Sequence, residues 1–297
     1  MAQNNLKHLH EYILDLVLEL IQFTEQDNIK NRMLIDKLTS ITEISSQFLF
    51  GPESKNGKAR ISNFGEIEFP NYDMGAISSF MYLDYREMAI FYLYLTKQKF
   101  YDFAIDLGAN IGLHSILLKR AGFAVVHSFE PDPLHFKELK KRIKLNRLKD
   151  IVINNVAVSN FSGRAQFTRV LGNTTGSHLS GAKADPYGVL EKFECEVYDI
   201  RKIIPLNVKT LIKMDIEGSE LEVLSAISDD HWTLVDCIVE VTSKAHAIGI
   251  FDLAKKQNLR IFSQKISWKL VSHVYEMPFS YKEGSVFLTK NAKWSFA

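Results

Sequence analysis

The feature that most constrains the fold is a regular alternation of strand-like runs and helix-length segments, which starts near Tyr101. The strand-like runs are short and apolar, and most are followed by a longer segment with apolar residues at helical spacing. The runs are FAIDLG, AVVHSFEP, IVINNVAVS, TLIKMDIEG and DCIVEVT, and we expect the helices at 112–121, 133–147, 219–228 and 245–257. Such alternation predicts a mainly parallel sheet with helices on both faces.

The two ends of the chain depart from this alternation. The late runs LRIFSQ and GSVFLTK lack a helical pattern between them, so we expect them to form a closing antiparallel pair. At the start, apolar residues 3 and 4 positions apart predict one amphipathic helix over 6–23 and another over 33–44. The sequence therefore divides into a helical extension at 1–50, a hairpin and helix at 51–98, and the sheet domain at 99–297. The heptad spacing of the first helix fits either packing on the chain's own body or contact between two copies.

Composition excludes some classes of partner. Thirty-six basic and 35 acidic residues leave a net charge of +1, so no overall field attracts nucleic acid or an anionic membrane. Cys195 and Cys237 lie in apolar surroundings without metal-ligand spacing, which predicts buried thiols in a reducing compartment. The N-terminal apolar segment carries Asp15 and Glu19 and is too short to span a bilayer, which needs about 20 residues. We therefore expect a cytoplasmic location and no transmembrane segment.

Carboxylates close several of the predicted strands. Asp106 ends the first strand, Glu130 the second, Asp215 and Glu217 the fourth, and Glu240 the fifth. In a doubly wound sheet, ligands bind at the carboxyl ends of the strands, so these side chains are candidates for a binding site.

The glycine turn after the first strand indicates what is bound. Gly108, Asn110 and Gly112 form a G-x-N-x-G pattern, which differs from the G-x-G-x-x-G of dinucleotide sites. Glu130 follows Gly108 by 22 positions, where a carboxylate can accept hydrogen bonds from two ribose hydroxyls. We expect Asp106 to point into the pocket, where it would repel a diphosphate and suit a cationic centre. S-adenosylmethionine has such a centre, a carboxylate and an adenosine. An NAD-type oxidoreductase is a less favoured alternative, and a non-catalytic binding module with the same fold is not excluded.

Four motifs in order carry a family resemblance: DLGANIG, FEPDP, NNVAVSNFSG and IKMDIEGSELEVL. Over about residues 80–290 the chain resembles the FkbM family of S-adenosylmethionine-dependent methyltransferases. The resemblance implies a class I, Rossmann-like fold with a seven-stranded, mostly parallel sheet. It also implies roles for several residues: the methionine end near Gly108, Asn110 and Gly112, the ribose on Glu130, and the adenine beside Asn155, Ala157 and Asp132. Upstream, LDYREM is similar to a Tyr-Glu pair of the family, although Arg86 separates Tyr85 from Glu87.

Methyl transfer to a hydroxyl needs alignment and a base. Asp215 and Glu217 are the expected pair, although Glu217 can also cap the following helix or pair with Lys213. His178, in the loop GNTTGSHLSG, is the alternative base. Asp215 with Glu240 can hold a divalent cation, which is not favoured because the sequence identifies no third ligand. The resemblance alone suggests the acceptor: a hydroxyl of a sugar, a surface polysaccharide precursor or a secondary metabolite.

Overall fold

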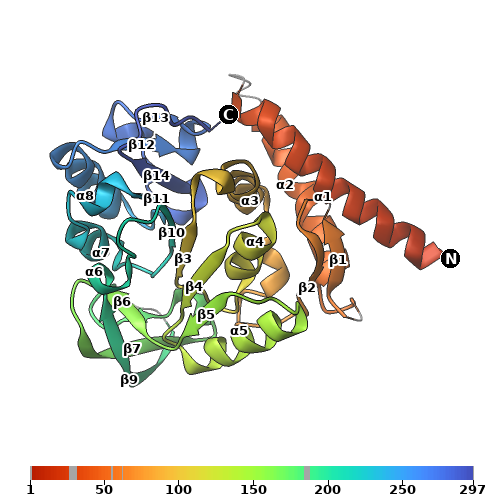
Figure 1. Cartoon of the computed structure of the whole chain (residues 1–297). Helices are drawn as coiled ribbons and strands as arrows, with labels where there is room; N and C mark the ends of the chain where they lie inside the picture. The colour runs from red at the N-terminus through yellow and green to blue at the C-terminus, as the bar shows by residue number, and fades with distance from the viewer. Residues whose placement is uncertain (1, 27–31, 55, 62, 184–187, 297) are drawn as a thin grey trace.

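A central sheet organises the computed structural model, which describes residues 2–26, 32–54, 56–61, 63–183 and 188–296 (Figure 1). Among these residues the sheet has eight strands in the order β13-β12-β14-β11-β10-β3-β4-β5. The five central strands are parallel: β3 (Phe103–Leu107), β4 (Val125–Phe129), β5 (Ile151–Asn154), β10 (Thr210–Met214) and β11 (Val235–Glu240). The predicted doubly wound, mostly parallel sheet is therefore confirmed.

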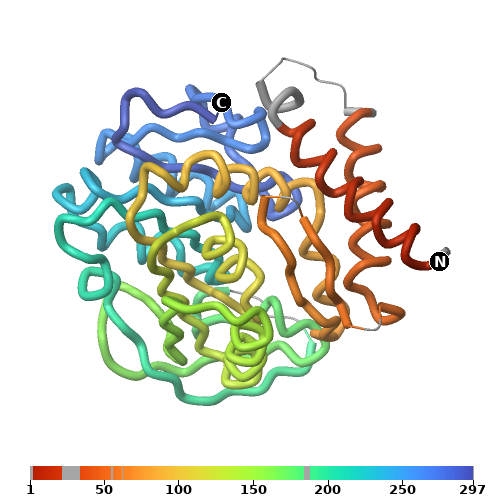
Figure 2. Tube along the Cα trace, turned by 45° about the vertical axis from the view of Figure 1, so that its right-hand side comes forward, coloured from red at the N-terminus to blue at the C-terminus, as the bar shows by residue number. Residues whose placement is uncertain are grey.

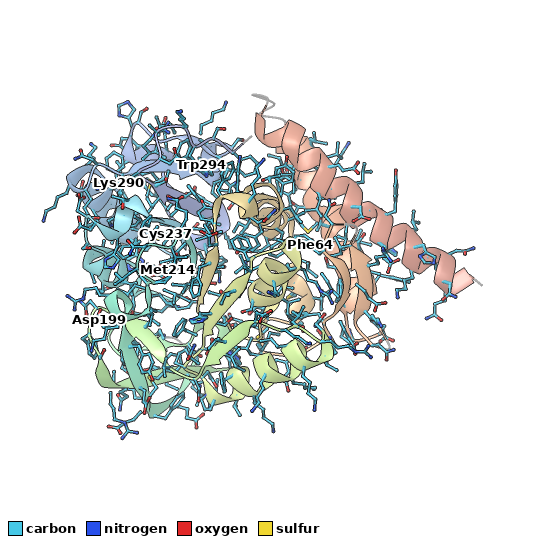
Figure 3. The ribbon with its side chains drawn as sticks, in the orientation of Figure 1. Phe64, Asp199, Met214, Cys237, Lys290 and Trp294 are labelled. Atoms are coloured by element: carbon cyan, nitrogen blue, oxygen red, sulfur yellow. The ribbon has the colours of Figure 1, made fainter. Side chains whose placement is uncertain are left out.

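The closing antiparallel pair is also confirmed. Strand β14 (Ser285–Thr289) runs antiparallel to β11 on one side and to β12 (Arg260–Ser263) on the other. With the parallel strands they make the seven predicted strands, and β13 (Lys269–Leu270) adds a two-residue edge strand. Met214 and Cys237 lie near the middle of the molecule (Figure 3), and both cysteines are free and buried, as predicted.

The helices that connect the strands begin and end close to the predicted positions. They are α4 (Leu113–Ala121), α5 (Pro133–Leu145), α7 (Glu220–Ala226) and α8 (Lys244–Lys256), with a short α6 (Ile200–Ile203) before β10. Local capping fixes their starts, because Asp132 accepts a hydrogen bond from the Leu134 amide and Ser243 accepts one from the His246 amide. Gly122 ends α4 in the left-handed conformation.

A second, four-stranded sheet was not predicted. It has the order β6-β9-β7-β8, formed by β6 (Ala157–Ser159), β9 (Val189–Asp199), β7 (Gly163–Leu171) and β8 (His178–Leu179). The prediction of one strand over 151–159 is wrong, because the chain leaves the central sheet after Asn154 and enters this one at Ala157. The Asn155 amide donates hydrogen bonds to the carbonyls of Glu130 and Pro131, which fixes the change of direction.

The N-terminal helices and hairpin pack along one side of the molecule (Figures 1 and 2). They comprise α1 (Ala2–Gln26), α2 (Arg32–Phe50), β1 (Lys58–Ile61) and β2 (Gly65–Glu68), and α3 (Tyr85–Lys97) connects them to the sheet. Buried residues of α1, such as Leu14 and Ile21, belong to the same apolar core as Phe91 of α3. The spacing picks out a stripe of residues 6, 9, 13, 16, 20 and 23, of which Leu6, Leu9 and Leu16 are exposed, Leu20 packs partly buried against this core, and the side chain of residue 23 lies outside the described part. No helix in the described part of the chain is long and apolar enough to cross a membrane.

Candidate active site

Two adjoining cavities open at the carboxyl ends of β3, β4 and β10. The first, the apolar cavity, has an empty volume of about 610 Å³, part of which is open to solvent. Apolar side chains make up about half of its lining, and the carboxylates of Glu130, Asp215 and Glu217 also line it. The apolar lining residues include Phe129, Val156, Ala157, Val158, Phe167, Leu179 and Ile216. Such a cavity suits a flat aromatic ring with a polar substituent.

Backbone amides hold Glu130 in place. Its Oε2 accepts a hydrogen bond of 2.8 Å from the Asn110 amide, and its Oε1 accepts one of 2.8 Å from the Asp132 amide. Burial raises the pKa of Glu130 to about 8. Each carboxylate oxygen keeps a second acceptor site, so Glu130 can still bind hydroxyl groups inside the cavity.

The glycine turn brings β3 against the loop after β10. Gly108 has φ +74°, and a Cβ there would lie 1.7 Å from the Asp215 carbonyl oxygen. Asn110 also has a positive φ, and its side-chain amide donates a 2.9 Å hydrogen bond to the Tyr82 hydroxyl. The Oδ1 atom of Asn110 has no partner within the described residues, and Asn110 lines both cavities. The turn therefore offers an unused acceptor to a ligand that spans the two cavities.

The second cavity, the acidic cavity, begins at Gly112 and the start of α4. Its lining includes Glu87 and His114, whose Oε2 and Nε2 atoms are 3.1 Å apart. The Tyr94 hydroxyl lies 2.9 Å from His114 Nδ1 and fixes the imidazole ring from behind. His114 follows the glycine turn at the start of α4, where the sequence predicts a position near the cofactor, whereas no motif pointed to Tyr82, which reaches the cavity through tertiary packing of the segment before α3.

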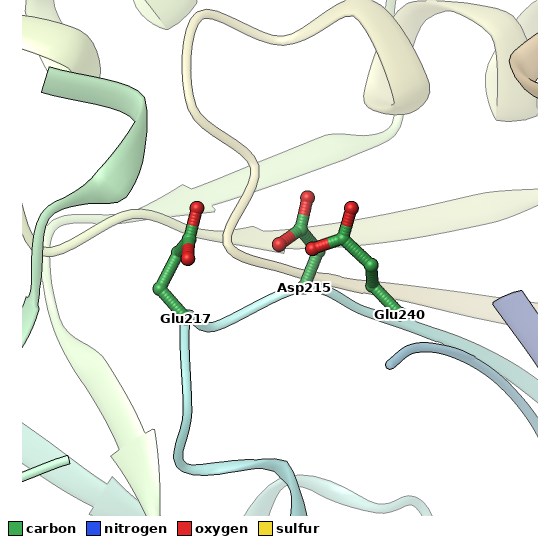
Figure 4. Close-up of side chains that lie close together, drawn as sticks. All are labelled: Asp215, Glu217 and Glu240. Atoms are coloured by element: carbon green, nitrogen blue, oxygen red, sulfur yellow. The ribbon is translucent and has the colours of Figure 1, made fainter. Parts of the chain in front are cut away.

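Three carboxylates from two neighbouring strand ends face one another in the acidic cavity (Figure 4). Asp215 and Glu217 follow β10, Glu240 ends β11, and each offers an oxygen within 4.8 Å of the others. Burial opposes ionisation of Asp215, but the Lys213 ammonium, 3.3 Å away, outweighs it and lowers the pKa of Asp215. Burial and the charge of Asp215 raise the pKa of Glu240 well above its ordinary value. The cluster therefore holds protons as well as negative charge.

Glu217 has the properties of a base. Burial and the Asp215 charge raise its pKa to about 7, against the opposing effect of Lys183, whose Nζ lies 2.5 Å from Glu217 Oε2. A group with a pKa near neutrality can take up and release a proton in ordinary conditions. The two structural alternatives do not hold for Glu217: the N-cap residue of α7 is Ser219, and Lys213 pairs with Asp215.

A tight turn presents Asp215 and Glu217 to the cavity. Strand β10 ends at Met214, and the backbone turns at Glu217, with φ +56°, and at Gly218, with φ +114°. The buried Glu220 accepts hydrogen bonds from the amides of Ile216 (3.0 Å) and Gly218 (2.9 Å). The sequence analysis did not predict that Glu220 would hold the turn in this way. The available signal was an acidic residue directly after the turn, the last residue of IEGSE.

Four predicted site residues lie outside the lining of both cavities. Asp106 does not point into the pocket, because its side chain is buried beneath α4 and accepts a 2.6 Å hydrogen bond from Ser115 Oγ. Asp132 caps α5 and pairs with Arg169 at 2.6 Å.

The other two are Asn155 and His178. The Asn155 amide supports the backbone of Glu130, as described above. His178 lies on β8 and not in a loop; it is buried, with Nδ1 2.9 Å from the Gly176 carbonyl oxygen, and burial lowers its pKa. Gly108, Asn110, Gly112, Glu130, Ala157, Asp215, Glu217 and Glu240 all line one cavity or both.

Comparison with known families agrees with this geometry. Residues 106–259, about half of the chain, match the family described as the methyltransferase FkbM domain. The chain belongs to the FkbM methyltransferase family. The matched region starts at Asp106, before the glycine turn, and ends beyond α8, so it contains most of both cavities.

Two curated relatives of this FkbM-family chain are fungal. "Methyltransferase 1" of Beauveria bassiana (strain ARSEF 2860) is 27% identical over 159 residues, which cover 46% of this chain and 63% of the relative. "Methyltransferase sdnD" of Sordaria araneosa is 28% identical over 170 residues, which cover 47% and 66%. Each match therefore spans slightly less than two thirds of the relative's own length.

Among solved structures, the N-terminal domain of human METTL16 in complex with SAH is 13% identical, with a TM-score of 0.38. That alignment covers 89% of this FkbM-family chain and 84% of the METTL16 chain. Precorrin-6y C5,15-methyltransferase from Geobacter metallireducens GS-15 is 10% identical, with a TM-score of 0.37, and the alignment covers 68% and 86%.

Proposed function

We propose that this FkbM-family chain is an S-adenosylmethionine-dependent O-methyltransferase. The acceptor is a hydroxyl of a sugar, a surface polysaccharide precursor or a secondary metabolite. The observation that supports this most is the juxtaposition of the apolar cavity, with Glu130 in its lining, and a carboxylate cluster in the adjoining acidic cavity. The arrangement suits a nucleoside cofactor beside a base that takes a hydroxyl proton.

The residues present fit S-adenosylmethionine. The apolar walls and Ala157 would contact the adenine, Glu130 would accept hydrogen bonds from the ribose, and the turn at Gly108 and Asn110 would hold the methionine end. When bound, the cofactor supplies a methyl group on a positively charged sulfur, and the attacking oxygen displaces that sulfur from the methyl carbon. Ionised Asp215 lies where the cavities meet and favours a cationic centre there.

Glu217 is the proposed base. Its carboxylate would take the proton of the acceptor hydroxyl as the oxygen–carbon bond forms and the carbon–sulfur bond breaks, and the proton would remain on Glu217 until solvent removes it. Lys183 orients the carboxylate by its ion pair. The pKa of Glu240 is raised by burial and by the Asp215 charge, and in its protonated form Glu240 can donate a hydrogen bond to the acceptor or to Asp215.

Charge in the acidic cavity favours an uncharged acceptor. Its described lining has the carboxylates of Asp84, Glu87, Asp215, Glu217 and Glu240 against the basic side chains of Arg86, Lys183 and Lys213. Lys213 and Lys183 are already paired with Asp215 and Glu217. A phosphorylated acceptor would find no unpaired lysine among these residues, so a neutral polyhydroxy compound fits better.

The test has a binding part and a turnover part. Calorimetry should show binding of S-adenosylmethionine, whereas binding of NADH and not of S-adenosylmethionine would favour an oxidoreductase. Mass spectrometry of a panel of sugars and glycan fragments should detect a gain of one methyl group. Binding without transfer to any member would favour a non-catalytic module.

Variants then locate the base. Asp215→Asn and Glu217→Gln should each abolish most transfer, whereas Glu222→Gln, an exposed carboxylate on the adjacent helix α7, should leave it unchanged. Full turnover in both Asp215→Asn and Glu217→Gln would show that the base lies elsewhere.

A divalent cation is a second candidate component, because hard cations bind carboxylate oxygens and three are grouped here. Lys213 and Lys183 already neutralise part of that charge, so we expect activity to survive an excess of chelator. Loss of activity that Mg²⁺ restores would instead establish a metal-dependent enzyme.

A further inference from the structure

Helix α1 carries two apolar faces, and only one is buried. Leu14, Val17, Leu18 and Ile21 are at most 2% exposed and pack into the core beside α3 and the hairpin. On a different face, Leu6 is 46% exposed, Leu9 51% and Leu16 38%. These three with half-buried Ile13 form a second apolar line, here called the outer stripe, on the helix at the edge of the molecule (Figures 1 and 2).

The spacing of the outer stripe is that of a coiled-coil seam. Leu6, Leu9, Ile13 and Leu16 are 3, 4 and 3 positions apart, which keeps them in line along the helix. A seam of this kind is completed by a helix that presents the same spacing. The outer stripe of a second copy of this chain offers that match, and pairing of identical patches gives a closed two-fold dimer.

The exposed apolar area is large enough for the centre of such an interface. Helix α2 packs beside α1, where the His10 ring stacks on Phe48 at 4.3 Å, and it exposes two further apolar side chains. Six side chains that are 38–63% exposed leave on the order of 500 Å² of apolar surface, against about 800 Å² on each side of a standard interface. They are Leu6, Leu9, Tyr12, Leu16, Ile41 and Ile44.

Charge argues against a membrane as the occupant. The sequence of α1 contains one lysine and four carboxylates. Interfacial membrane helices are instead rich in lysine and arginine on their polar face. Beside the outer stripe, Glu19 is a lone carboxylate at a flanking heptad position, so two copies can approach without a row of like charges.

We propose that two copies of this chain associate through the outer stripe of α1, with Ile41 and Ile44 of α2 at the margin. The inference is independent of the proposed methyl transfer, because the outer stripe shares no residue with either cavity.

Light scattering coupled to gel filtration tests the dimer directly. The full chain should have twice the mass of one copy, and Leu9→Glu/Leu16→Glu should have the mass of one copy. Leu206→Glu, at a 76% exposed leucine outside α1 and α2, is the matched control and should remain a dimer. A circular dichroism spectrum and a melting curve close to those of the full chain would show that the double variant is folded.

Cross-linking gives a second, independent readout. Ile13 lies in the middle of the outer stripe, so in a two-fold pair Ile13→Cys should form a disulfide-linked dimer on mild oxidation, and Leu206→Cys should not. A monomeric full chain, a dimer that persists in Leu9→Glu/Leu16→Glu, or a monomer that sediments with anionic lipid vesicles through α1 would each overturn the proposal.

Discussion

Glu217 has a strained backbone conformation and a buried carboxyl group whose ionisation is unfavourable. Both features belong to its proposed role as a base. Its φ of +56° is unusual for a residue with a side chain, and burial next to Asp215 raises its pKa to about 7. A base acts in its ionised form, so the rate should depend on how much of Glu217 has lost its proton.

We expect kcat/KM to rise about tenfold per pH unit below pH 7 and to level off above it. Lys183→Met removes the ammonium that lowers the pKa of Glu217, so the midpoint should move to higher pH. Methyl-transfer rates between pH 5 and 9 measure both profiles. An unchanged midpoint in Lys183→Met would show that Glu217 does not set this limb of the profile.

The same pKa predicts an effect on stability. The carboxyl of Glu217 has a pKa of about 7 in the fold against an ordinary value of 4.5, so between these pH values the folded state binds more protons than the unfolded state. Stability therefore falls as pH rises through this window. Glu217→Gln removes the cost of ionising a buried carboxyl group. It should therefore raise Tm at pH 8 relative to the unsubstituted protein, with a smaller change at pH 5. Calorimetry at both pH values checks this, and an equal shift at both would contradict it.

Cofactor affinity is expected to depend on the side chain of Glu130. Glu130→Ala should weaken S-adenosylmethionine binding by about 1–3 kcal/mol, because the hydrogen bonds between its carboxyl group and the ribose hydroxyls are lost. Glu194→Ala, an exposed carboxylate on β9, is the control and should bind normally. Isothermal calorimetry decides, and unchanged affinity in Glu130→Ala would remove this residue from the site.

At the scale of elements, the contact between β3 and the loop after β10 is the closest in the site. Gly108→Ala would place a Cβ 1.7 Å from the Asp215 carbonyl oxygen and push the two strand ends apart. Gly65 has the same φ of +74° but open space around it, so Gly65→Ala carries the backbone strain without the collision. We expect Gly108→Ala to lose cofactor binding and about 1–3 kcal/mol more stability than Gly65→Ala, measured by denaturant unfolding. Equal effects of the two variants would refute the close approach.

The alternating elements were predictable because each has a strong local signal. From β3 to α8, apolar periodicity and capping residues such as Asp132 and Ser243 act over a few positions. The second sheet lacks such a signal. Residues 151–159 are continuously strand-like, and the break at Asn155 depends on the carbonyls of Glu130 and Pro131, which lie 25 and 24 positions away.

At the scale of the whole molecule, topology explains which site residues the sequence could reveal. Parallel strands bring their carboxyl ends to one edge, so Glu130, Asp215 and Glu240 meet there once the alternation is recognised. Side-chain direction was harder to predict. Asp106 is on a neighbouring strand end but turns beneath α4, and Tyr82 reaches the site from a segment that the alternation does not include.

The N-terminal helices are the part of the molecule whose contribution the sequence described least well. The heptad spacing places Leu9 on the apolar stripe of α1, yet Leu9 is exposed, and Leu18, on another face of the helix, is buried in the core. Since Leu18 packs with residues of α3 and the hairpin in one cluster, loss of its side chain should destabilise the entire fold and not the helix alone.

Leu18→Ala should therefore lower the free energy of unfolding by about 2–5 kcal/mol, the usual range for a buried leucine. Leu9→Ala removes the same atoms from an exposed position of the same helix and should change the stability of the single chain by less than about 0.5 kcal/mol. Denaturant unfolding, followed by circular dichroism for the helices and by fluorescence of the buried tryptophans of the sheet domain, Trp232, Trp268 and Trp294, measures both. Coincident transitions that shift together in Leu18→Ala would show one cooperative core; an early loss of helix with an unshifted fluorescence transition would show that residues 1–50 fold as a separate unit.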